Sequence, residues 1–134
     1  MKTKFCLHKG WKLLESPFEA VPAAKDVASL CTHPDENWLE IPEMPRQVQE
    51  ALCEAGKIED PAAYEAAAKC LWVGERDWVY RLEFDAEAAA PHHRLLFEGL
   101  DTLVTVYLNG ERIARHDNLF LPLEIDVTGR LQGK

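Results

Sequence analysis

Apolar and polar residues alternate most regularly between residues 104 and 108. Val104, Val106 and Leu108 are separated by Thr105 and Tyr107. Every second side chain of a β-strand points to the same face, so a period of two predicts a strand with one apolar face. We therefore expect a strand here whose valines pack against the rest of the chain.

A two-residue turn signal follows this strand directly. Asn109–Gly110 supplies two residues that tolerate positive φ, as both central residues of a type I′ hairpin turn must. A two-residue loop sets Leu108 opposite Glu111 and Val106 opposite Ile113. That register puts Ile113 on the same face as the valines, so the turn and the hydrophobic pattern predict the same hairpin.

Shorter strand signals lie on both sides of the hairpin. Trp78, Tyr80, Leu82 and Phe84 occupy alternate positions, which predicts a strand over residues 78–84. Further strands are expected over residues 5–14, 38–41, 95–97 and 121–127, with turns or loops at 74–77 and 116–118.

Two segments in the N-terminal half predict short helices. Pro45 suits the first turn of a helix over residues 45–55, Val48 and Leu52 form its apolar stripe, and Gly56 suits the position after its end. The alanine-rich segment 61–69 has high helix propensity. Residues 15–37 are interrupted by prolines, and we expect them to be irregular.

Several short strands with one or two short helical inserts predict a mainly β domain. The chain has 134 residues, which is enough for one domain with a core, so residues 1–134 are expected to form a single domain. The final residues, RLQGK, come just after a turn, where another strand should return to the sheet. We expect that strand to be missing because the sequence is a piece of a longer chain.

The charge and hydropathy of the chain exclude some classes of partner. Its formal net charge of −8 argues against nucleic acid or an anionic membrane as a partner. No apolar run approaches the ~20 residues of a membrane span. The N-terminus, MKTKFCLHKGW, lacks the apolar region of a signal peptide. We therefore expect a cytoplasmic protein that handles neutral ligands.

The cysteines and histidines do not form a recognisable metal motif. The cysteines stand far apart, at Cys6, Cys31, Cys53 and Cys70, with no C-x-x-C pair. Two disulfides would be possible in a secreted protein, but without a signal peptide we favour reduced, mostly buried thiols. The adjacent pair His92–His93 is interpreted as solvated loop residues. No metal and no other cofactor is expected.

The motifs come in an order that resembles the N-terminal domain of glycoside hydrolase family 2 enzymes, and most closely the β-mannosidase branch. The matching segments are Leu71–Tyr80, Phe97–Thr102, Leu108–Gly110, Asp117–Phe120 and Asp126–Thr128. Upstream, Trp38–Pro42, the helix after Pro45 and Lys57–Pro61 also resemble that branch. Each motif alone is weak, but their order and spacing together are fairly specific.

The sequence departs from that branch in two places. The branch usually shows V-P-G-C/T-V-H before the first helix, where this chain has Ile41–Arg46. It usually shows an aromatic-rich segment ending in Asp-Asn-Glu after the Asp-Pro, where this chain has Ala62–Lys69. Residues 15–34 align with nothing in the branch. The departures leave the sugar specificity open.

The resemblance implies a galactose-binding-like jelly-roll β-sandwich that packs against a catalytic barrel and helps to wall its active site. The family's retaining mechanism uses two carboxylates, an acid/base and a nucleophile, about 5 Å apart. Both belong to the later barrel domain. This chain alone is therefore expected to be inactive.

The polar loop between two tryptophans is the first candidate for a site near substrate. Sugars bind through aromatic faces that stack on their C–H surfaces and through planar polar side chains that pair with their hydroxyls. The loop supplies these residue types as Trp72, Glu75, Arg76, Asp77 and Trp78. The alternative is that Trp78 is a core aromatic, which we favour, and that Asp77 only caps the turn.

Asn118 is the second candidate, because an Asn in a loop can orient a hydroxyl group. Asp117 and Asn118 are also common turn formers, and this structural interpretation is favoured. No catalytic residue can be assigned from the sequence.

Three functions fit these observations. The first is the N-terminal module of a β-mannosidase-like family 2 glycosidase, whose partners are the catalytic barrel and the other domains of that protein. The second is a free-standing carbohydrate-binding module. The third, compatible with the first, is a module that docks against its own catalytic domain through an exposed apolar surface.

Overall fold

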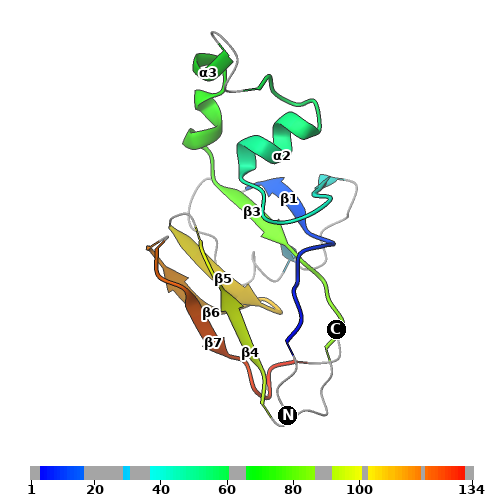
Figure 1. Cartoon of the computed structure of the whole chain (residues 1–134), viewed down its shortest axis with the longest axis vertical. Coiled ribbons are helices and arrows are strands. Elements are labelled where there is room, and N and C mark those ends of the chain that lie inside the picture. Colours follow the sequence, from blue (N-terminus) through cyan, green and yellow to red (C-terminus); the bar gives the residue numbers. More distant parts are fainter. Residues whose placement is uncertain are drawn as a thin grey trace. The chain divides into compact units, whose positions relative to one another are not determined.

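The structure of the chain is a computed structural model that describes residues 4–16, 29–30, 37–60, 66–86, 92–100, 103–118 and 120–131. The chain divides into two compact units (Figure 1). The first comprises residues 1–19 and 34–83, and the second comprises residues 20–33 and 84–134.

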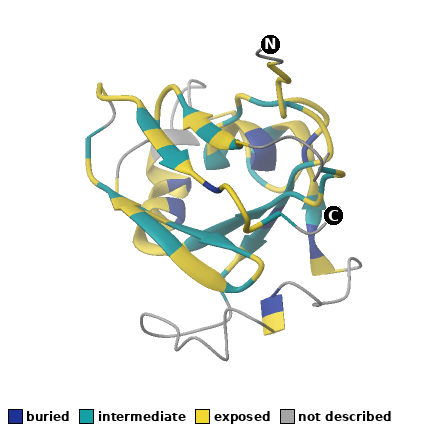
Figure 2. Cartoon of the chain, turned by 90° about the horizontal axis from the view of Figure 1, so that it is seen from below, coloured by how far each residue is buried: buried dark blue, intermediate teal, exposed yellow. Residues whose placement is uncertain are grey.

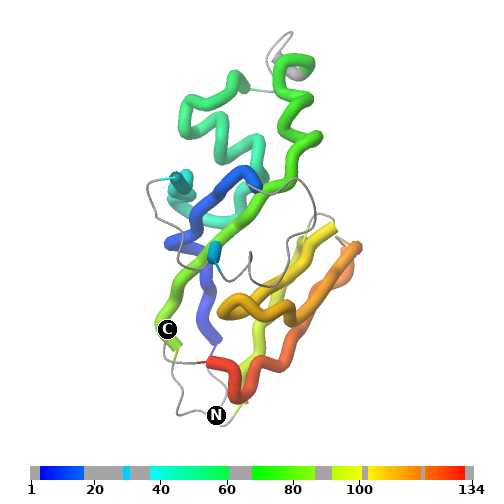
Figure 3. Tube along the Cα trace, turned by 180° about the vertical axis from the view of Figure 1, so that it is seen from behind, coloured from blue at the N-terminus to red at the C-terminus, as the bar shows by residue number. Residues whose placement is uncertain are grey.

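The first unit is built on a small antiparallel sheet. Its strands are β1 (Lys12–Glu15), β2 (Leu39–Glu40) and β3 (Trp78–Arg81), in the order β2-β1-β3. Figure 3 shows β1 in blue running beside β3 in green. The register pairs Leu13 with Leu39 on one side and with Tyr80 on the other. β1 is therefore the central strand, although it is short.

The core of the first unit lies on one face of this sheet. Leu13 and Ile41 are each 2% exposed and Ala51 is 4% exposed. Partly buried apolar residues pack around these three: Trp11, Leu39, Met44, Val48, Trp78 and Tyr80. Figure 2 shows how few positions of the described chain are fully buried.

Helix α2 (Val48–Glu54) covers the core through its buried Ala51 and Leu52. It ends in the hydrogen-bond pattern of a Schellman motif, in which Gly56 N–H donates to Cys53 O and Lys57 N–H donates to Leu52 O. Gly56 has a φ of 73°, so the predicted glycine at the end of the helix is confirmed. The helix begins at Val48, later than the residue 45 at which the predicted helix 45–55 begins.

Two further helical segments connect α2 to β3. They are α3 (Ala66–Lys69) and the 3₁₀ helix η2 (Leu71–Glu75). The predicted loop at 74–77 is therefore partly helical. Residues 61–65 of the predicted helix 61–69 lie outside the described residues.

The second unit holds two antiparallel pairs of strands. β4 (Arg94–Phe97) pairs with β7 (Leu123–Asp126), and β5 (Val104–Leu108) pairs with β6 (Glu111–His116). Val127, next to β7, is 1% exposed, and its N–H donates to His93 O. The predicted strands at 95–97 and 104–108 are confirmed, and the strand predicted over 121–127 is shorter.

The predicted hairpin turn is confirmed by its backbone. Asn109 has a φ of 51° and Gly110 a φ of 85°, so both central residues occupy the left-handed region. Leu108 pairs with Glu111, as a two-residue loop requires.

The predicted register beyond the turn is wrong by one residue. Val106 pairs with Ala114 and not with Ile113, because a β-bulge lies between the pairs of Val106 and Tyr107. A bulge inserts one extra residue in one strand, and neither the turn residues nor the alternation of apolar and polar residues predicts it. Ile113 and Ala114 are both half-buried as a result.

The other strands are shorter than the periodicity predicts. Only Lys12–Glu15 of the predicted strand 5–14 is extended in a sheet, and β3 ends at Arg81 where the alternation continues to Phe84. Most of the irregular segment 15–37 lies outside the described residues. The prediction of a mainly β chain with short helical inserts is confirmed.

Candidate functional site

An open groove of about 550 Å³ lies in the first unit, over the end of β1 and β3. Its lining is mostly apolar and aromatic, with a small number of polar groups. The lining residues are Leu13, Leu14, Glu15, Asn37, Leu39, Leu52, Lys57, Trp72 and Trp78. Sites for small ligands commonly combine such an apolar lining with few polar groups.

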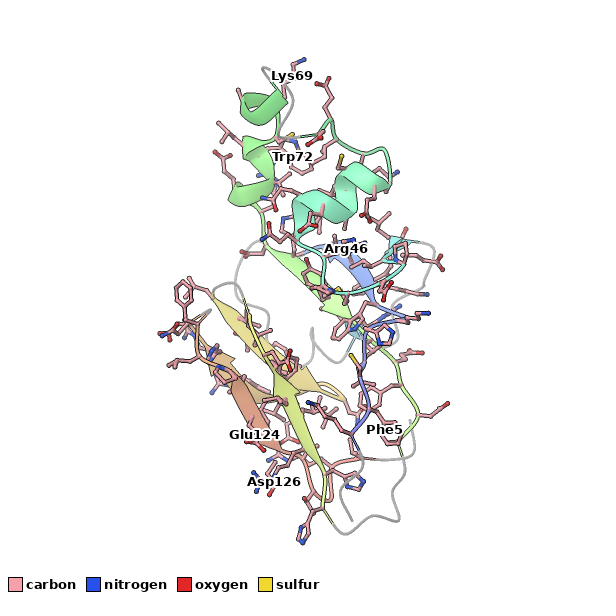
Figure 4. The ribbon with its side chains drawn as sticks, viewed as in Figure 1. Phe5, Arg46, Lys69, Trp72, Glu124 and Asp126 are labelled. Atoms are coloured by element: carbon pink, nitrogen blue, oxygen red, sulfur yellow. The ribbon has the colours of Figure 1, made fainter. Side chains whose placement is uncertain are left out.

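Two tryptophans give the groove its aromatic character. Trp72 on η2 and Trp78 on β3 have ring centroids 6.1 Å apart and ring planes inclined by 46°. The Trp78 indole Nε1–H donates to Val73 O at 2.9 Å, which fixes that ring against η2. Trp72 is 38% exposed and is labelled in Figure 4. Trp72 is therefore the more exposed of the two tryptophans.

An ion pair borders the groove. Glu15 is the register partner of Trp78 between β1 and β3. Its Oε1 lies 3.0 Å from Nε of Arg76. The main chain joins the same two segments, because Ser16 N–H donates to Asp77 O at 2.8 Å. The loop before β3 is thus held to the end of β1 by one backbone and one side-chain interaction.

The structure separates the residues of the predicted loop site. Trp72 and Trp78 line one groove, and Arg76 reaches its border through Glu15. The described lining does not include Glu75 or Asp77, and both are exposed. The packing of Trp78 on the core agrees with the favoured structural interpretation of that residue.

Asn118 belongs to the second unit and makes local contacts. Its Oδ1 accepts a hydrogen bond from Phe120 N–H at 2.9 Å. Its main-chain O lies 2.7 Å from His116 Nε2, which is also 2.8 Å from Leu121 O. Carbonyl oxygens only accept hydrogen bonds, so His116 Nε2 carries the proton and donates it to these two main-chain oxygens. The shared hydrogen bond holds the loop in its turn. These bonds favour the interpretation of Asn118 as a turn former.

Sequence reasoning missed the polar residues of the groove. Glu15 ends β1, Lys57 follows the glycine that ends α2, and Asn37 stands just before Trp38. The end of a strand and the position after a helix cap were both recognisable signals of surface position. Their convergence with Trp72 depends on tertiary contacts that no local pattern records.

Tyr80 supports the segment that leads into α2. Its hydroxyl donates to Arg46 O at 3.0 Å. Burial, and then the nearby carboxylate of Glu50, raise the pKa of Tyr80 to about 12. The phenol is therefore neutral at ordinary pH and acts here as a hydrogen-bond donor and not as a base.

No cluster of three potential metal-binding side chains occurs within the described residues. Among the cysteines that the structure describes, Cys6 is exposed, Cys53 half-buried and Cys70 buried, and all three are free thiols. Cys31 lies outside the described residues. The helices of the described ranges are also too short and too polar to cross a membrane.

Residues 25–134 match a protein family described as "Glycosyl hydrolase 2 galactose-binding domain-like". The chain belongs to this family. The predicted galactose-binding-like β fold is therefore confirmed, and so is the resemblance to glycoside hydrolase family 2.

Several proteins that are similar to this galactose-binding-like chain are β-mannosidases. β-Mannosidase B of Aspergillus clavatus is 32% identical over 98% of this chain, and that of Thermothelomyces thermophilus is 38% identical over 75% of it. A crystal structure of β-D-mannosidase from Dictyoglomus thermophilum superposes with a TM-score of 0.75 and 29% identity over 94% of this chain.

This galactose-binding-like chain spans only a small part of those proteins. It covers 14% of the Aspergillus enzyme, 12% of the Thermothelomyces enzyme and 14% of the Dictyoglomus chain. The chain thus matches the N-terminal domain of β-mannosidases.

Proposed function

We propose that this chain acts as the non-catalytic N-terminal domain of a β-mannosidase-like retaining glycosidase, where it packs on the catalytic barrel and helps to wall the active site. The family match and the β-mannosidase relatives support this proposal. The two catalytic carboxylates of the retaining mechanism would belong to the barrel. The chain by itself would then not hydrolyse glycosides.

The groove of the first unit is the observation that carries the proposed contact with sugar. Trp72 offers an exposed ring face, and Lys57 and Asn37 offer donors on the same lining. Stacking on an aromatic face together with a few polar contacts suits a neutral, C–H-rich sugar ring. Within the groove Trp72 is the residue we assign nearest to substrate, with Trp78 fixing its surroundings.

The predicted loop residues contribute to this wall unequally. Arg76 is engaged by Glu15 at the border of the groove, so its guanidinium would position the loop more than bind a hydroxyl. Glu75 and Asp77 are exposed beside it and are free to face a second domain. We assign these two acidic residues to the outer part of the wall.

An apolar cluster in the second unit supports the packing role. Leu103 is 78% exposed, Phe120 is 89% exposed and Leu121 is 57% exposed. Leu103 precedes Val104, the register partner of His116, and His116 contacts Leu121 O. The three apolar residues therefore gather at one end of the β5–β6 ribbon. Exposed apolar residues in a group indicate a surface that another protein part covers.

The decisive experiment uses the longest polypeptide encoded by the reading frame that contains this domain. Trp72→Ala in that polypeptide should lower kcat/KM for an aryl β-mannoside about tenfold, because an aromatic contact at a sugar is worth about 1.4 kcal/mol. Leu71→Ala is the matched control, because Leu71 is 69% exposed on the same short helix but does not line the groove. It should leave kcat/KM within about twofold.

Two results would refute the proposed function. One is a reading frame that stops without encoding a catalytic barrel. The other is hydrolysis of the aryl β-mannoside by residues 1–134 alone. Equal kcat/KM for the Trp72→Ala and Leu71→Ala variants would refute the narrower claim that the groove contacts substrate.

A free-standing carbohydrate-binding module is the alternative, and the exposed ring of Trp72 favours it. In that case residues 1–134 should bind manno- or galacto-oligosaccharides without any further domain. Calorimetric titration distinguishes the two. Heat that the wild-type chain shows at millimolar ligand and the Trp72→Ala variant does not would favour the module, and no heat would count against it.

A further inference from the structure

Glu15 occupies a position of β1 on the face that packs on the core. Successive side chains of a strand point to opposite faces, so Glu15 lies on the same face as Leu13, which is 2% exposed. Their register partners on β3 are Trp78 for Glu15 and Tyr80 for Leu13, and both aromatic residues pack on the cluster around Leu13. The alternation therefore predicts an apolar residue at position 15, where the chain has a carboxylate.

The Glu15 carboxylate lies beside aromatic rings. Glu15, Trp72 and Trp78 line the same groove, and the centroids of the two rings are 6.1 Å apart. The Glu15 side chain is 48% exposed, so part of it is removed from water. Removing a charged group from water costs free energy unless hydrogen bonds replace the water. A charge that breaks the apolar pattern beside a groove is more typical of a binding role than of a folding role.

Arg76 satisfies only part of this carboxylate. Its Nε lies 3.0 Å from Oε1 of Glu15. The two oxygens of a carboxylate together offer about four lone-pair directions to donors. Within the part of the chain that the structure describes, Arg76 is the only side-chain partner found for Glu15. The ion pair thus fixes the orientation of the carboxylate and leaves it able to accept further hydrogen bonds from a ligand.

The charges around the groove favour a neutral ligand that donates hydrogen bonds. A carboxylate accepts hydrogen bonds and does not donate them, so its ligand must bring N–H or O–H groups. Among the described residues, the groove and its border hold two cations, Lys57 and Arg76, and one anion, Glu15. The excess of positive charge disfavours a cationic ligand, and the carboxylate disfavours an anionic group beside it. Hydroxyl groups are the neutral donors that a sugar presents on adjacent carbons.

We propose that Glu15 determines which sugars the groove accepts, because its carboxylate receives hydrogen bonds from two hydroxyls on adjacent carbons of the sugar ring. The groove then selects a sugar with a free pair of adjacent hydroxyls and rejects one in which either hydroxyl is missing or alkylated. This inference rests on the proposed function, since it takes the groove to contact sugar. It adds the residue and the pair of hydroxyls on which the selection depends.

A purely structural role for Glu15 makes a different prediction. If Glu15 only holds the loop before β3 through Arg76, the loss of either partner of the ion pair has the same effect. If Glu15 binds hydroxyls, its loss removes the selection, whereas the loss of Arg76 leaves the acceptor in the groove. Glu15→Leu and Arg76→Gln therefore form a matched pair of variants. Glu15→Leu also restores the apolar pattern of β1, so it should fold with a Tm close to that of the wild type.

The test measures binding to the longest polypeptide encoded by the reading frame that contains this domain. The ligands are the methyl thioglycoside of β-mannose, whose sulfur link resists hydrolysis, and its analogues in which one hydroxyl at a time is replaced by hydrogen. Calorimetric titration gives the Kd of each ligand. The ratio of the analogue's Kd to the parent's Kd is the penalty for losing that hydroxyl. Comparing these penalties between variants cancels the contributions of other domains.

Glu15→Leu should lower the penalties for two hydroxyls on adjacent carbons about tenfold each, because their hydrogen bonds to a charged acceptor are lost. The penalties for the other hydroxyls should stay within about twofold of the wild-type values. Arg76→Gln should leave all penalties within the same limit. Glu15→Gln keeps the size of the side chain and is the second variant. It should lower the same two penalties about threefold, because a neutral amide oxygen remains as an acceptor.

Three results would overturn the inference. One is that Glu15→Leu and Glu15→Gln leave every penalty unchanged. Another is that Arg76→Gln lowers the same penalties as Glu15→Leu, which would make Glu15 a support for the loop and nothing more. The last is that the wild-type polypeptide binds none of these ligands.

The readout is binding and not hydrolysis, so the inference and the proposed function fail separately. A polypeptide that shows the two Glu15-dependent penalties but cleaves no β-mannoside would refute the proposed function alone. A polypeptide that cleaves β-mannosides, and whose penalties do not depend on Glu15, would refute the inference alone.

Discussion

Arg76 Nε lies 3.0 Å from Glu15 Oε1, and this ion pair ties the loop before β3 to the end of β1 at the border of the groove. The sequence places the two residues 61 positions apart, and only the antiparallel register of β1 and β3 brings them together. Both side chains are about half exposed, with 53% of Arg76 and 48% of Glu15 accessible to solvent. Water therefore weakens the attraction, and the pair is expected to orient the loop more than to stabilise the fold.

A double-mutant cycle between Glu15→Gln and Arg76→Gln tests that assignment. The coupling free energy should be about 0.2–1 kcal/mol, as for other exposed ion pairs. It should shrink when the ionic strength rises from about 0.05 to about 0.5 M, because salt screens exposed charges. Urea denaturation of the four proteins measures it. A coupling above about 2 kcal/mol that ignores salt would show that the pair is part of the core and not of the groove border.

The hydrogen bond from Tyr80 to Arg46 O predicts a measurable loss in Tyr80→Phe. The variant keeps the ring but leaves the Arg46 carbonyl without this donor. The free energy of unfolding at neutral pH should fall by about 1 kcal/mol. Tyr107→Phe is the matched control, because no hydrogen bond of its hydroxyl is found in the described part of the chain. It should change the stability by less than about 0.5 kcal/mol.

The raised pKa of Tyr80 predicts how stability depends on alkaline pH. Its pKa is about 12 in the folded chain, above the ordinary value of 10.0. The folded state therefore holds the phenolic proton more tightly, and this contribution is fully present below pH 10 and is lost as the pH rises towards 12. Tyr80→Phe should flatten the decline of stability in that window. Equal slopes for the wild type and the variant would contradict the assignment.

Truncating a buried side chain of the central strand β1 should lower the free energy of unfolding far more than truncating an exposed apolar side chain. Leu13 is 2% exposed between Leu39 and Tyr80, so Leu13→Ala removes packing that the neighbours cannot recover. The free energy of unfolding should fall by about 2–5 kcal/mol. Leu103→Ala, at a residue 78% exposed, should change it by less than about 0.5 kcal/mol. Chemical denaturation followed by tryptophan fluorescence compares the two, and similar losses would contradict the placement of the core.

The sequence predicted the local features of the fold better than their long-range pairing. Gly56 and the Asn109–Gly110 turn were predictable because a positive φ restricts the residue type. The bulge that displaces Ile113 was not, because an extra residue in a strand leaves the alternation locally intact. The alternation that continues to Phe84 predicted a strand longer than β3, which ends at Arg81. Periodicity shows which side chains can be buried, but it does not show where the partner strand ends.

The candidate site was predictable only in its aromatic part. Trp72 and Trp78 stood out as large rings on either side of a polar loop, and they do share one groove. Glu15 and Lys57 are ordinary charged residues in the sequence, and their place on the groove follows from sheet register and from where α2 ends. Register and helix packing are set by contacts between distant segments, which composition and spacing do not record.

The left-handed backbone of Gly110 predicts that the hairpin cannot accept a side chain there without strain. Gly110 has a φ of 85°, in the region where a Cβ atom approaches the neighbouring carbonyl oxygen. Gly110→Ala should lower the free energy of unfolding by about 1–2 kcal/mol. Gly74→Ala is the matched control, because Gly74 has no positive φ and open space where its Cβ would lie, and it should be neutral or slightly stabilising. If instead both variants lose the same stability in urea, the turn is not the type I′ turn that sets the register of β5 and β6. Gly110→Asn separates strain from side-chain volume, since asparagine tolerates this region better than alanine does and should recover part of the loss despite its larger side chain.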